Sequence, residues 1–337
     1  MLRPPEMLQW KAPPSLTETK FCNLCCKQGA TKRCGPCKTS YCSAACQRKD
    51  WPSHKKCCGL AARIRAVPRN DQAAYETGVA TALGVDAGAV AFAVPTARHP
   101  ETCAICLEEF SFQGGHIYMN CCSQFIHLRC SQQKLKYDLR EDPFGMTGNQ
   151  ACPLCRAPSP PIERAAGDRV IVERLRGHVA RDDASAQYQM GCDLIHGSLP
   201  KLGRDVAEGL KLLEASARGG GGFGSLMGAQ KLAYLYIYDR AVNPEDYDLG
   251  RRGVNYAAKV ARQGGLGCMV VLAECYLKGY FVEQDQAKAV KLLACAAFRG
   301  DDRAKNLLAH TSWDKPSLAR ADAKWPAPLA DLPEPCA

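Results

Sequence analysis

Four closely spaced pairs of cysteine and histidine residues stand between residues 22 and 58, and we call them the first group. The pairs are Cys22 and Cys25, Cys34 and Cys37, Cys42 and Cys46, and His54 and Cys58. A structural zinc ion takes four thiolate or imidazole donors in a tetrahedron. Short spacing within a pair lets one turn of the chain present both donors to the same ion. The first group therefore predicts two zinc ions with no coordination position left open for a substrate water.

A second group of metal-binding residue types follows between residues 103 and 155. Its members are Cys103, Cys106, Cys121, Cys122, His127, Cys130, Cys152 and Cys155. Residues 1–6 lack the apolar segment of a secretory signal, so we expect the cytoplasm or the nucleus. In such a reducing compartment, paired cysteines indicate metal sites rather than disulfides. The two groups together predict four zinc ions.

The first group, with its aromatic and polar neighbours, resembles a MYND zinc finger over residues 21–58. The motifs that carry the resemblance are Tyr41-Cys42-Ser43, Cys46-Gln47, Trp51 and His54-Lys55-Lys56-Cys57-Cys58. The resemblance implies that the first and third pairs share one ion, and that the second and fourth pairs share the other. It also implies binding of proline-containing peptides, with Gln47 and Trp51 as contacts. Alternatively, Trp51 is a core side chain. Cys57 could compete with Cys58 as a ligand, although the family spacing favours Cys58.

The second group resembles a RING zinc finger over residues 101–158. The sequences Cys103-Ala104-Ile105-Cys106 and Cys152-Pro153-Leu154-Cys155-Arg156 carry the resemblance. The chain departs from the family at Gln124, where a histidine ligand is usual, and the adjacent Cys121 and Cys122 resemble a variant form. This implies interleaved sites. Cys103, Cys106, His127 and Cys130 would hold one ion, and Cys121, Cys122, Cys152 and Cys155 the other. A PHD-like finger is the alternative fold.

The RING resemblance implies a ubiquitin ligase that performs no covalent chemistry itself. Such a module positions a charged ubiquitin-conjugating enzyme, so that its thioester lies near an attacking lysine. The docking contacts would be Ile105, Pro153 and Leu154, and Arg156 would bridge enzyme and ubiquitin. Many ligases carry a tryptophan in the helix after the sixth ligand, whereas this chain has the polar segment 131–134 there, followed by Leu135. A non-enzymatic adaptor is therefore the second hypothesis.

A helical pattern recurs between residues 184 and 310. Ala186, Met190, Gly191, Leu194 and Gly197 have the same offsets as Cys268, Leu272, Ala273, Tyr276 and Gly279, with a weaker copy from Gly228. These offsets keep one helix face apolar, and their small residues let a partner helix approach. The second half of each copy ends alike, and its terminal glycine suits a left-handed cap. These glycines are Gly220, Gly264 and Gly300. The region resembles Sel-one-like repeats, relatives of the tetratricopeptide repeat, which implies a solenoid. A generic helical bundle is the alternative.

The sequence thus predicts a multidomain protein with two small zinc-stabilised modules, a MYND finger and a RING-like cross-brace, followed by an all-α helix-turn-helix solenoid. The expected segments are a disordered tail at 1–20, the finger at 21–58, an alanine- and glycine-rich linker with possible short helices at 59–100, the RING-like module at 101–158, a connecting helix at 163–181, the repeats at 184–310 and a proline-rich tail at 311–337.

The overall charge does not favour nucleic acid as a partner. The 44 Lys and Arg exceed the 34 Asp and Glu by 10, but zinc-bound thiolates lower the net charge to about +4. The basic residues around the first group either favour acidic partners or form an ordinary solvated surface. The most apolar stretch, 79–94, is shorter than the roughly 20 residues of a membrane helix. We therefore expect a soluble protein without a membrane partner.

Overall fold

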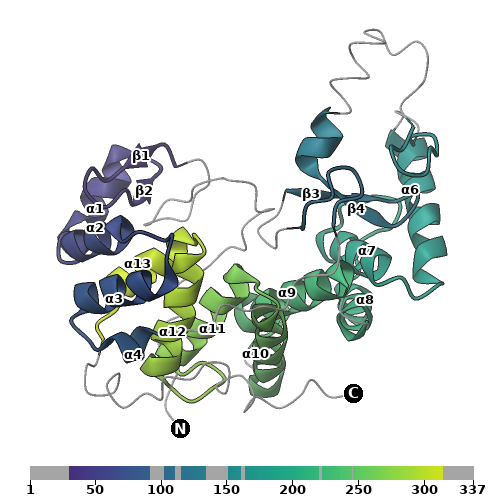
Figure 1. Cartoon of the computed structure of the whole chain (residues 1–337). Coiled ribbons are helices and arrows are strands. Elements are labelled where there is room, and N and C mark those ends of the chain that lie inside the picture. Colours follow the sequence, from purple (N-terminus) through teal and green to yellow (C-terminus); the bar gives the residue numbers. More distant parts are fainter. Residues whose placement is uncertain are drawn as a thin grey trace. The chain divides into compact units, whose positions relative to one another are not determined.

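A computed structural model of the chain describes residues 30–91, 102–110, 115–133, 151–160, 164–219, 222–244 and 246–313 (Figure 1). The chain divides into two compact units. One comprises Met1–Val94, Ile237–Val254 and Leu266–Glu334, and the other comprises Pro95–Tyr236, Asn255–Gly265 and Pro335–Ala337. The unit boundary therefore crosses α9 (Phe223–Tyr238) and α10 (Tyr247–Arg262). The expected tail at 1–20 and the tail residues after 313 lie outside the described residues.

The first unit begins with a small hairpin followed by helices. Strand β1 (Lys32–Arg33) pairs antiparallel with β2 (Ser40–Tyr41). The helices that follow are α1 (Ala44–His54), α2 (Cys58–Ala66), α3 (Gln72–Leu83) and the short α4 (Ala87–Val90). The unit also holds α11 (Leu266–Lys278), α12 (Gln286–Phe298) and α13 (Asp302–His310).

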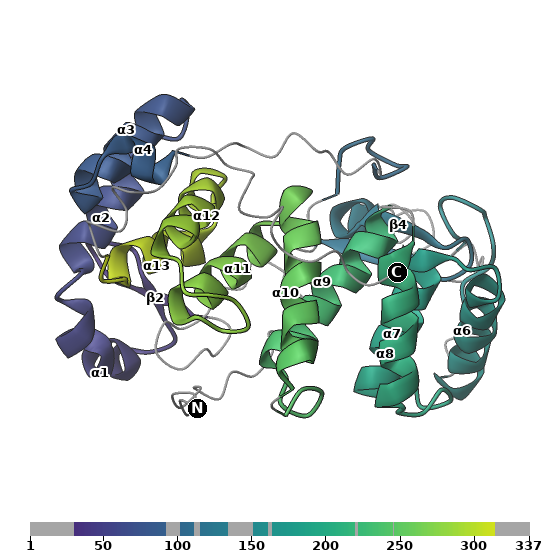
Figure 2. The same ribbon diagram turned by 90° about the horizontal axis from the view of Figure 1, so that it is seen from below.

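Helices from the two ends of the chain pack together in the first unit. Helix α2 lies against α13, and both α3 and α4 lie against α12, as both views show (Figures 1 and 2). The rings of Tyr75 and Phe298 lie 5.3 Å apart at this contact. The segment expected to be a linker at 59–100 therefore contains helices that bury Ile64, Tyr75 and Val79. Their apolar side chains find a surface that is distant in sequence, which a linker composition does not predict.

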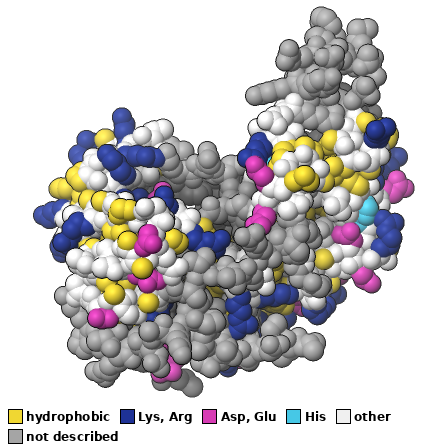
Figure 3. All heavy atoms as spheres, viewed as in Figure 1, with side chains coloured by type: hydrophobic (Ala, Val, Ile, Leu, Met, Phe, Trp, Pro, Cys, Tyr) yellow, Lys and Arg dark blue, Asp and Glu magenta, His cyan; other side chains and the backbone are white. Residues whose placement is uncertain are grey.

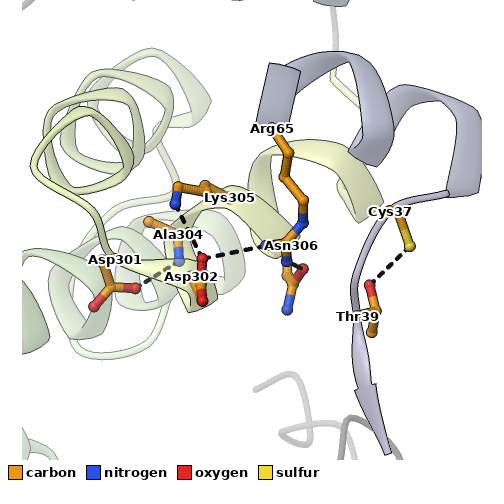
Figure 4. A network of polar contacts seen from close by, with 8 residues as sticks. All are labelled: Cys37, Thr39, Arg65, Asp301, Asp302, Ala304, Lys305 and Asn306. Carbon is orange, nitrogen blue, oxygen red and sulfur yellow. Dashed lines mark hydrogen bonds and ion pairs between the residues drawn. The ribbon is translucent and has the colours of Figure 1, made fainter. Parts of the chain in front are cut away.

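Polar contacts also join α2 to α13 (Figure 4). Arg65 donates to the Asp302 carboxylate, with 3.2 Å between Nη1 and Oδ1, and to the Asn306 side-chain oxygen. Lys305 also pairs with Asp302 at 3.0 Å. The N-terminus of α13 is capped by Asp301, whose carboxylate accepts from the Ala304 backbone N–H at 2.8 Å. The first turn of α13 is thus held by both local and distant partners.

The second unit combines a small hairpin with helices. Strands β3 (His116–Met119) and β4 (Gln124–His127) pair antiparallel, with Ile117 opposite Ile126. The helices are α6 (Arg164–Val179), α7 (Ala184–His196) and α8 (Val206–Arg218), with most of α9. Helix α6 lies within the segment 163–181, where a connecting helix was expected. It also contacts the hairpin region, because Arg174 donates to the Asn120 side chain at 3.2 Å.

An aromatic core joins the β3–β4 hairpin to α9 within the second unit. Phe223, at the start of α9, is fully buried and stacks on Phe110 with 4.8 Å between ring centroids. It also meets Phe125 and His116 edge-on at 5.0 and 4.9 Å. Edge-to-face and offset aromatic pairs add to the free energy of area burial. The hairpin module therefore shares one hydrophobic core with the helices.

Most residues of the helical pattern are buried. Gly197 and Gly279 follow α7 and α11 in left-handed conformations, with φ of 65° and 68°. Gly191 of α7 faces α8 so closely that a Cβ there would lie 2.9 Å from the Gly209 carbonyl oxygen.

The helix N-termini share one feature that the sequence pattern did not predict, an aspartate cap. These caps are Asp71, Asp86, Asp183, Asp205, Asp285 and Asp301. None of the helices described here is both long and apolar enough to cross a membrane.

Candidate metal centres

Three Cys-x2-Cys pairs adopt the same turn, although they are far apart in sequence. In each, the residue after the second cysteine is not glycine and has a left-handed backbone, at Lys38 (φ 58°), Leu107 (φ 59°) and Arg156 (φ 60°). Its N–H donates to the carbonyl of the first cysteine at 2.9, 2.8 and 3.0 Å, respectively. A side chain in this region costs on the order of 1–3 kcal/mol and persists only where its surroundings impose it. The same strained turn at the same place in three pairs indicates a common demand, namely aiming two sulfur atoms at one point.

Four members of the first group form a closed cluster in the first unit. Its members are Cys34, Cys37, His54 and Cys58, whose donor atoms lie within 4.8 Å of one another, and all four are buried. Cys34 Sγ lies 3.6 Å from Cys58 Sγ, and His54 Nε2 lies 3.2 Å from Cys37 Sγ. Tetrahedral zinc with its usual bond lengths places two sulfurs about 3.8 Å apart, and sulfur and nitrogen about 3.6 Å apart. The cluster therefore has the size and the donor set of a structural zinc site.

Three elements position this cluster, and its surroundings favour the metal-binding protonation states of Cys37 and His54, whereas burial raises the pKa of Cys58 to about 12. Cys34 and Cys37 lie in the β1–β2 turn, His54 ends α1 and Cys58 begins α2. Burial raises the pKa of the Cys37 thiol, but hydrogen bonds from the Thr39 side chain and backbone outweigh it, so that its pKa lies below the usual value. Burial also lowers the pKa of His54. Thiolate and neutral imidazole are the forms that bind zinc.

The other site of the first group is described only in part. Cys42 and Cys46, at the start of α1, bring their sulfurs to 3.5 Å. Their expected partners, Cys22 and Cys25, lie outside the described residues. The structure places Cys58, rather than Cys57, in the closed cluster, and the Cys57 thiol instead donates to the His54 carbonyl at 3.2 Å.

The second group forms two further clusters, both in the second unit. One contains Cys103, Cys106, His127 and Cys130, and the other contains Cys121, Cys122, Cys152 and Cys155. In the first, Cys106 Sγ lies 3.1 Å from His127 Nδ1. In the second, Cys155 Sγ lies 3.4 Å from Cys121 Sγ. Gln124 is exposed at the start of β4 and belongs to neither cluster. The two clusters alternate along the chain. Cys121 and Cys122 lie in sequence between the two pairs of the first cluster, and His127 and Cys130 lie between the two pairs of the second.

Hydrogen bonds around the second group separate its thiols into two kinds. The pKa of Cys152 lies at about 7, because backbone N–H groups of Cys155 and Leu154 outweigh the effect of burial. The pKa of Cys106 also lies at about 7, where the effect of burial is outweighed by His127 and neighbouring thiols. Burial raises the pKa of Cys122 and of Cys130 to about 11. Each cluster thus combines a thiol that ionises readily with one that needs a cation to ionise.

The residues expected to bind partners differ in exposure. Ile105 is 40% exposed and its neighbour Leu107, which the sequence analysis missed, is 76% exposed. Arg156 is exposed, whereas Pro153 and Leu154 are half-buried, Leu154 against the aromatic core. In the finger, Gln47 is half-buried.

Trp51 is 46% exposed. Its ring lies 5.8 Å from that of His54, so it covers the metal cluster from outside rather than filling a core. Lys and Arg side chains gather over the same part of the surface, where Figure 1 places β1 and α1 (Figure 3). The described basic residues of this surface are exposed: Lys32, Arg33, Lys38, Arg48, Lys49, Lys55 and Lys56.

Comparison with known proteins identifies the first of these regions. Residues 22–58 match the family model of the MYND finger. The chain is 46% identical over 55 residues to Dauer abnormal formation protein 25 of Caenorhabditis elegans, and the matched segment covers 16% of this chain and 14% of the relative. It is 40% identical over 67 residues to Ubiquitin carboxyl-terminal hydrolase 19 of Arabidopsis thaliana, which covers 19% of this chain and 10% of the relative. No solved structure matches the chain significantly. The chain therefore contains a MYND zinc finger, and these relatives share only a small part of their length with it.

Proposed function

We propose that this MYND-finger protein is a RING-type ubiquitin ligase that binds four zinc ions. In this proposal the second group folds as a variant RING cross-brace and recruits a ubiquitin-conjugating enzyme. The finger and the helices, which we propose to be Sel-one-like repeats, select the substrate. The proposed location is the cytoplasm, the nucleus or both.

The observation that carries the proposal is the alternation of the two clusters in the second unit. Cys103 and Cys106 join His127 and Cys130, whereas the intervening Cys121 and Cys122 join Cys152 and Cys155. Two zinc ions bound in this interleaved order would fix the two Cys-x2-Cys turns at 103–107 and 152–156. Filled by protein donors alone, such ions are structural and take no part in bond making.

The exposed side chains of those two turns support a docking role. Ile105 and Leu107 are exposed apolar residues on one turn, and Arg156 is exposed on the other. An apolar contact at Ile105 and Pro153 would hold the conjugating enzyme. The fixed fork of donors on Arg156 would bridge the enzyme and ubiquitin. Catalysis would then consist of holding the thioester in place for an attacking lysine.

The finger supports a role in binding proline-containing peptides. Trp51 offers an exposed aromatic face, and Gln47 lies one helical turn before it on α1. Proline-rich segments dock readily on exposed aromatic side chains, because their extended conformation is already formed before binding. The basic surface around Trp51 would favour peptides that also carry acidic residues.

An autoubiquitination assay with the full chain and a panel of conjugating enzymes tests the ligase proposal. We expect Ile105→Ala and Arg156→Ala each to reduce product formation at least tenfold while the zinc content stays unchanged. Lys38→Ala is the matched control, because Lys38 occupies the same left-handed turn position in the finger. A wild-type chain that yields no product with any enzyme of the panel would contradict the proposal.

A non-enzymatic adaptor is the second candidate, and one observation favours it. The helical residues after Cys130 begin with Ser131, Gln132 and Gln133, which offer no large apolar side chain to a conjugating enzyme. Leu135 lies outside the described residues. Under this alternative, Ile105→Ala and Arg156→Ala leave partner capture and the cellular effect of the protein unchanged.

A further inference from the structure

One ring nitrogen of His54 has no hydrogen-bond partner in the described structure. The side chain is 1% exposed, and its Nε2 faces the sulfurs of Cys37 and Cys34 at 3.2 and 3.4 Å. Nδ1 is buried and unpaired. A histidine that binds a metal through one nitrogen carries a proton on the other, and it almost always donates that proton to a partner. Zinc bound at Nε2 therefore requires an acceptor beside Nδ1.

His310, at the last turn of α13, reaches this position from the other end of the chain. The rings of His54 and His310 lie 5.7 Å apart with 29° between their planes. Nitrogen atoms of the two rings lie within 4.8 Å of each other and of the Cys57 sulfur. His310 belongs to the same compact unit as the finger.

The hydrogen bond on the other side of His310 determines which nitrogen can accept. His310 Nδ1 lies 2.7 Å from the Asn306 carbonyl oxygen. Because a carbonyl only accepts, Nδ1 carries the hydrogen, and Nε2 of the neutral ring keeps a free lone pair. The Cys57 sulfur is the competing acceptor, but sulfur accepts weakly and its thiol already donates to the His54 carbonyl.

We propose that His310 is the positioning residue of the zinc ligand His54: its Nε2 accepts the His54 Nδ1–H, directly or through one water, and couples zinc binding in the finger to docking of α13. This rests on the proposed zinc site at Cys34, Cys37, His54 and Cys58.

The contacts around α13 explain how such coupling is transmitted. Asn306 accepts from Arg65 through its side chain and from His310 through its carbonyl. Arg65 belongs to α2, which begins at the ligand Cys58. Two zinc ligands are therefore connected to the same turn of α13. His54 is connected through His310, and Cys58 is connected through α2 and Arg65. Loss of the ion would loosen α13, and loss of α13 would weaken the site.

Zinc affinity of the full chain, measured by competition with a chromogenic chelator, tests the proposal. We expect His310→Ala to lower the affinity for one zinc ion by about 10- to 100-fold, which is the usual effect of removing the hydrogen-bond partner of a metal ligand. His310→Gln, whose amide oxygen can accept, should recover most of the loss, and Cys57→Ala should leave affinity unchanged. Wild-type affinity in His310→Ala, or an equal loss in Cys57→Ala, would overturn the role of His310.

Cobalt spectra distinguish positioning from a general loosening of the helix. The visible bands of the site are identified as those that Cys37→Ser removes. His310→Ala should shift these bands, whereas Arg65→Ala, which weakens the same helix contact without touching His54, should leave them in place. A chain in which Cys37→Ser changes neither metal content nor spectrum would reject the zinc site itself. Normal binding with unshifted bands in His310→Ala would reject only the proposal for His310.

Discussion

The two cysteine-rich modules contact their helices through different kinds of interaction. In the first unit, the contact between α2 and α13 includes a polar network, in which Arg65 binds Asp302 and Asn306. In the second unit, the hairpin meets α9 through an aromatic core centred on Phe223. Aromatic burial contributes several kcal/mol per ring, whereas partly exposed ion pairs contribute about 1 kcal/mol or less. The second module should therefore be bound firmly, and the first should depend on its metal and on specific polar partners.

Removal of the central aromatic ring should have the largest effect on this contrast. Phe223→Ala should lower the free energy of unfolding of the second unit by about 3–5 kcal/mol, because it empties a fully buried site. Tyr247→Ala is the control, since Tyr247 is 56% exposed and surface substitutions stay within about 0.5 kcal/mol. Chemical denaturation of the zinc-loaded chain measures both. Equal effects of the two substitutions would contradict the aromatic docking.

A glycine substitution in the helices that support the second module should have the next largest effect on the free energy of unfolding. Gly191→Ala should lower the free energy of unfolding by about 1–3 kcal/mol, because the new methyl group meets the Gly209 carbonyl across the α7–α8 contact. Gly177→Ala in α6 meets nothing within 4 Å, so it should stabilise by up to about 1 kcal/mol through helix propensity. Opposite signs in thermal melts are the expected result. A stabilising Gly191→Ala would show that the helices are less closely packed.

The polar docking of the first module should be weaker and sensitive to salt. Arg65→Ala should lower the free energy of unfolding by about 1–2 kcal/mol, since Arg65 is largely buried and loses two partners. Lys211→Ala removes an exposed pair with Glu208 and should cost less than about 0.5 kcal/mol. We expect the difference to shrink in 1 M salt, as measured by urea titration. An Arg65→Ala loss as large as that of Phe223→Ala would remove the contrast between the modules.

Thiol reactivity should distinguish Cys152 from the core cysteine Cys295, and this is the smallest effect on stability that we predict. In the metal-free chain, the pKa of Cys152 at about 7 makes it roughly half thiolate at pH 7. Burial raises the pKa of Cys295 to about 12, so it stays protonated. Alkylation of Cys152 should rise from pH 6 to 8 and then level off, and Cys295 should stay unmodified while its helix is folded. Peptide mass spectrometry measures both, and equal rates would contradict the assignment.

The ligand pairs were visible in the sequence because metal binding imposes spacing. Two donors must lie on one turn, so Cys34 and Cys37, or Cys152 and Cys155, are recognisable without any structure. The exposure of Trp51 and of Leu107 could not be predicted, because the same residue types also fill cores. Whether each cluster holds zinc stays a prediction.

The docking of the finger onto the C-terminal helices could not be predicted. Arg65 and Asn306 are 241 residues apart, and no local pattern links a single arginine to a distant amide. The segment 59–100 is rich in alanine and glycine, so its composition indicated a linker rather than packed helices. The positive φ angles of Gly264 and Gly300 were predicted correctly, because the conformation that ends a helix depends on local sequence.

Native mass spectrometry of the full chain, expressed with zinc, measures the central claim most directly. We predict four zinc ions per chain, falling to three in Cys37→Ser and to three in Cys152→Ser. A wild-type count of three with no loss in Cys152→Ser would contradict the site at Cys121, Cys122, Cys152 and Cys155. A count of two, unchanged by Cys152→Ser, would remove the second metal-binding module and with it the proposed ligase.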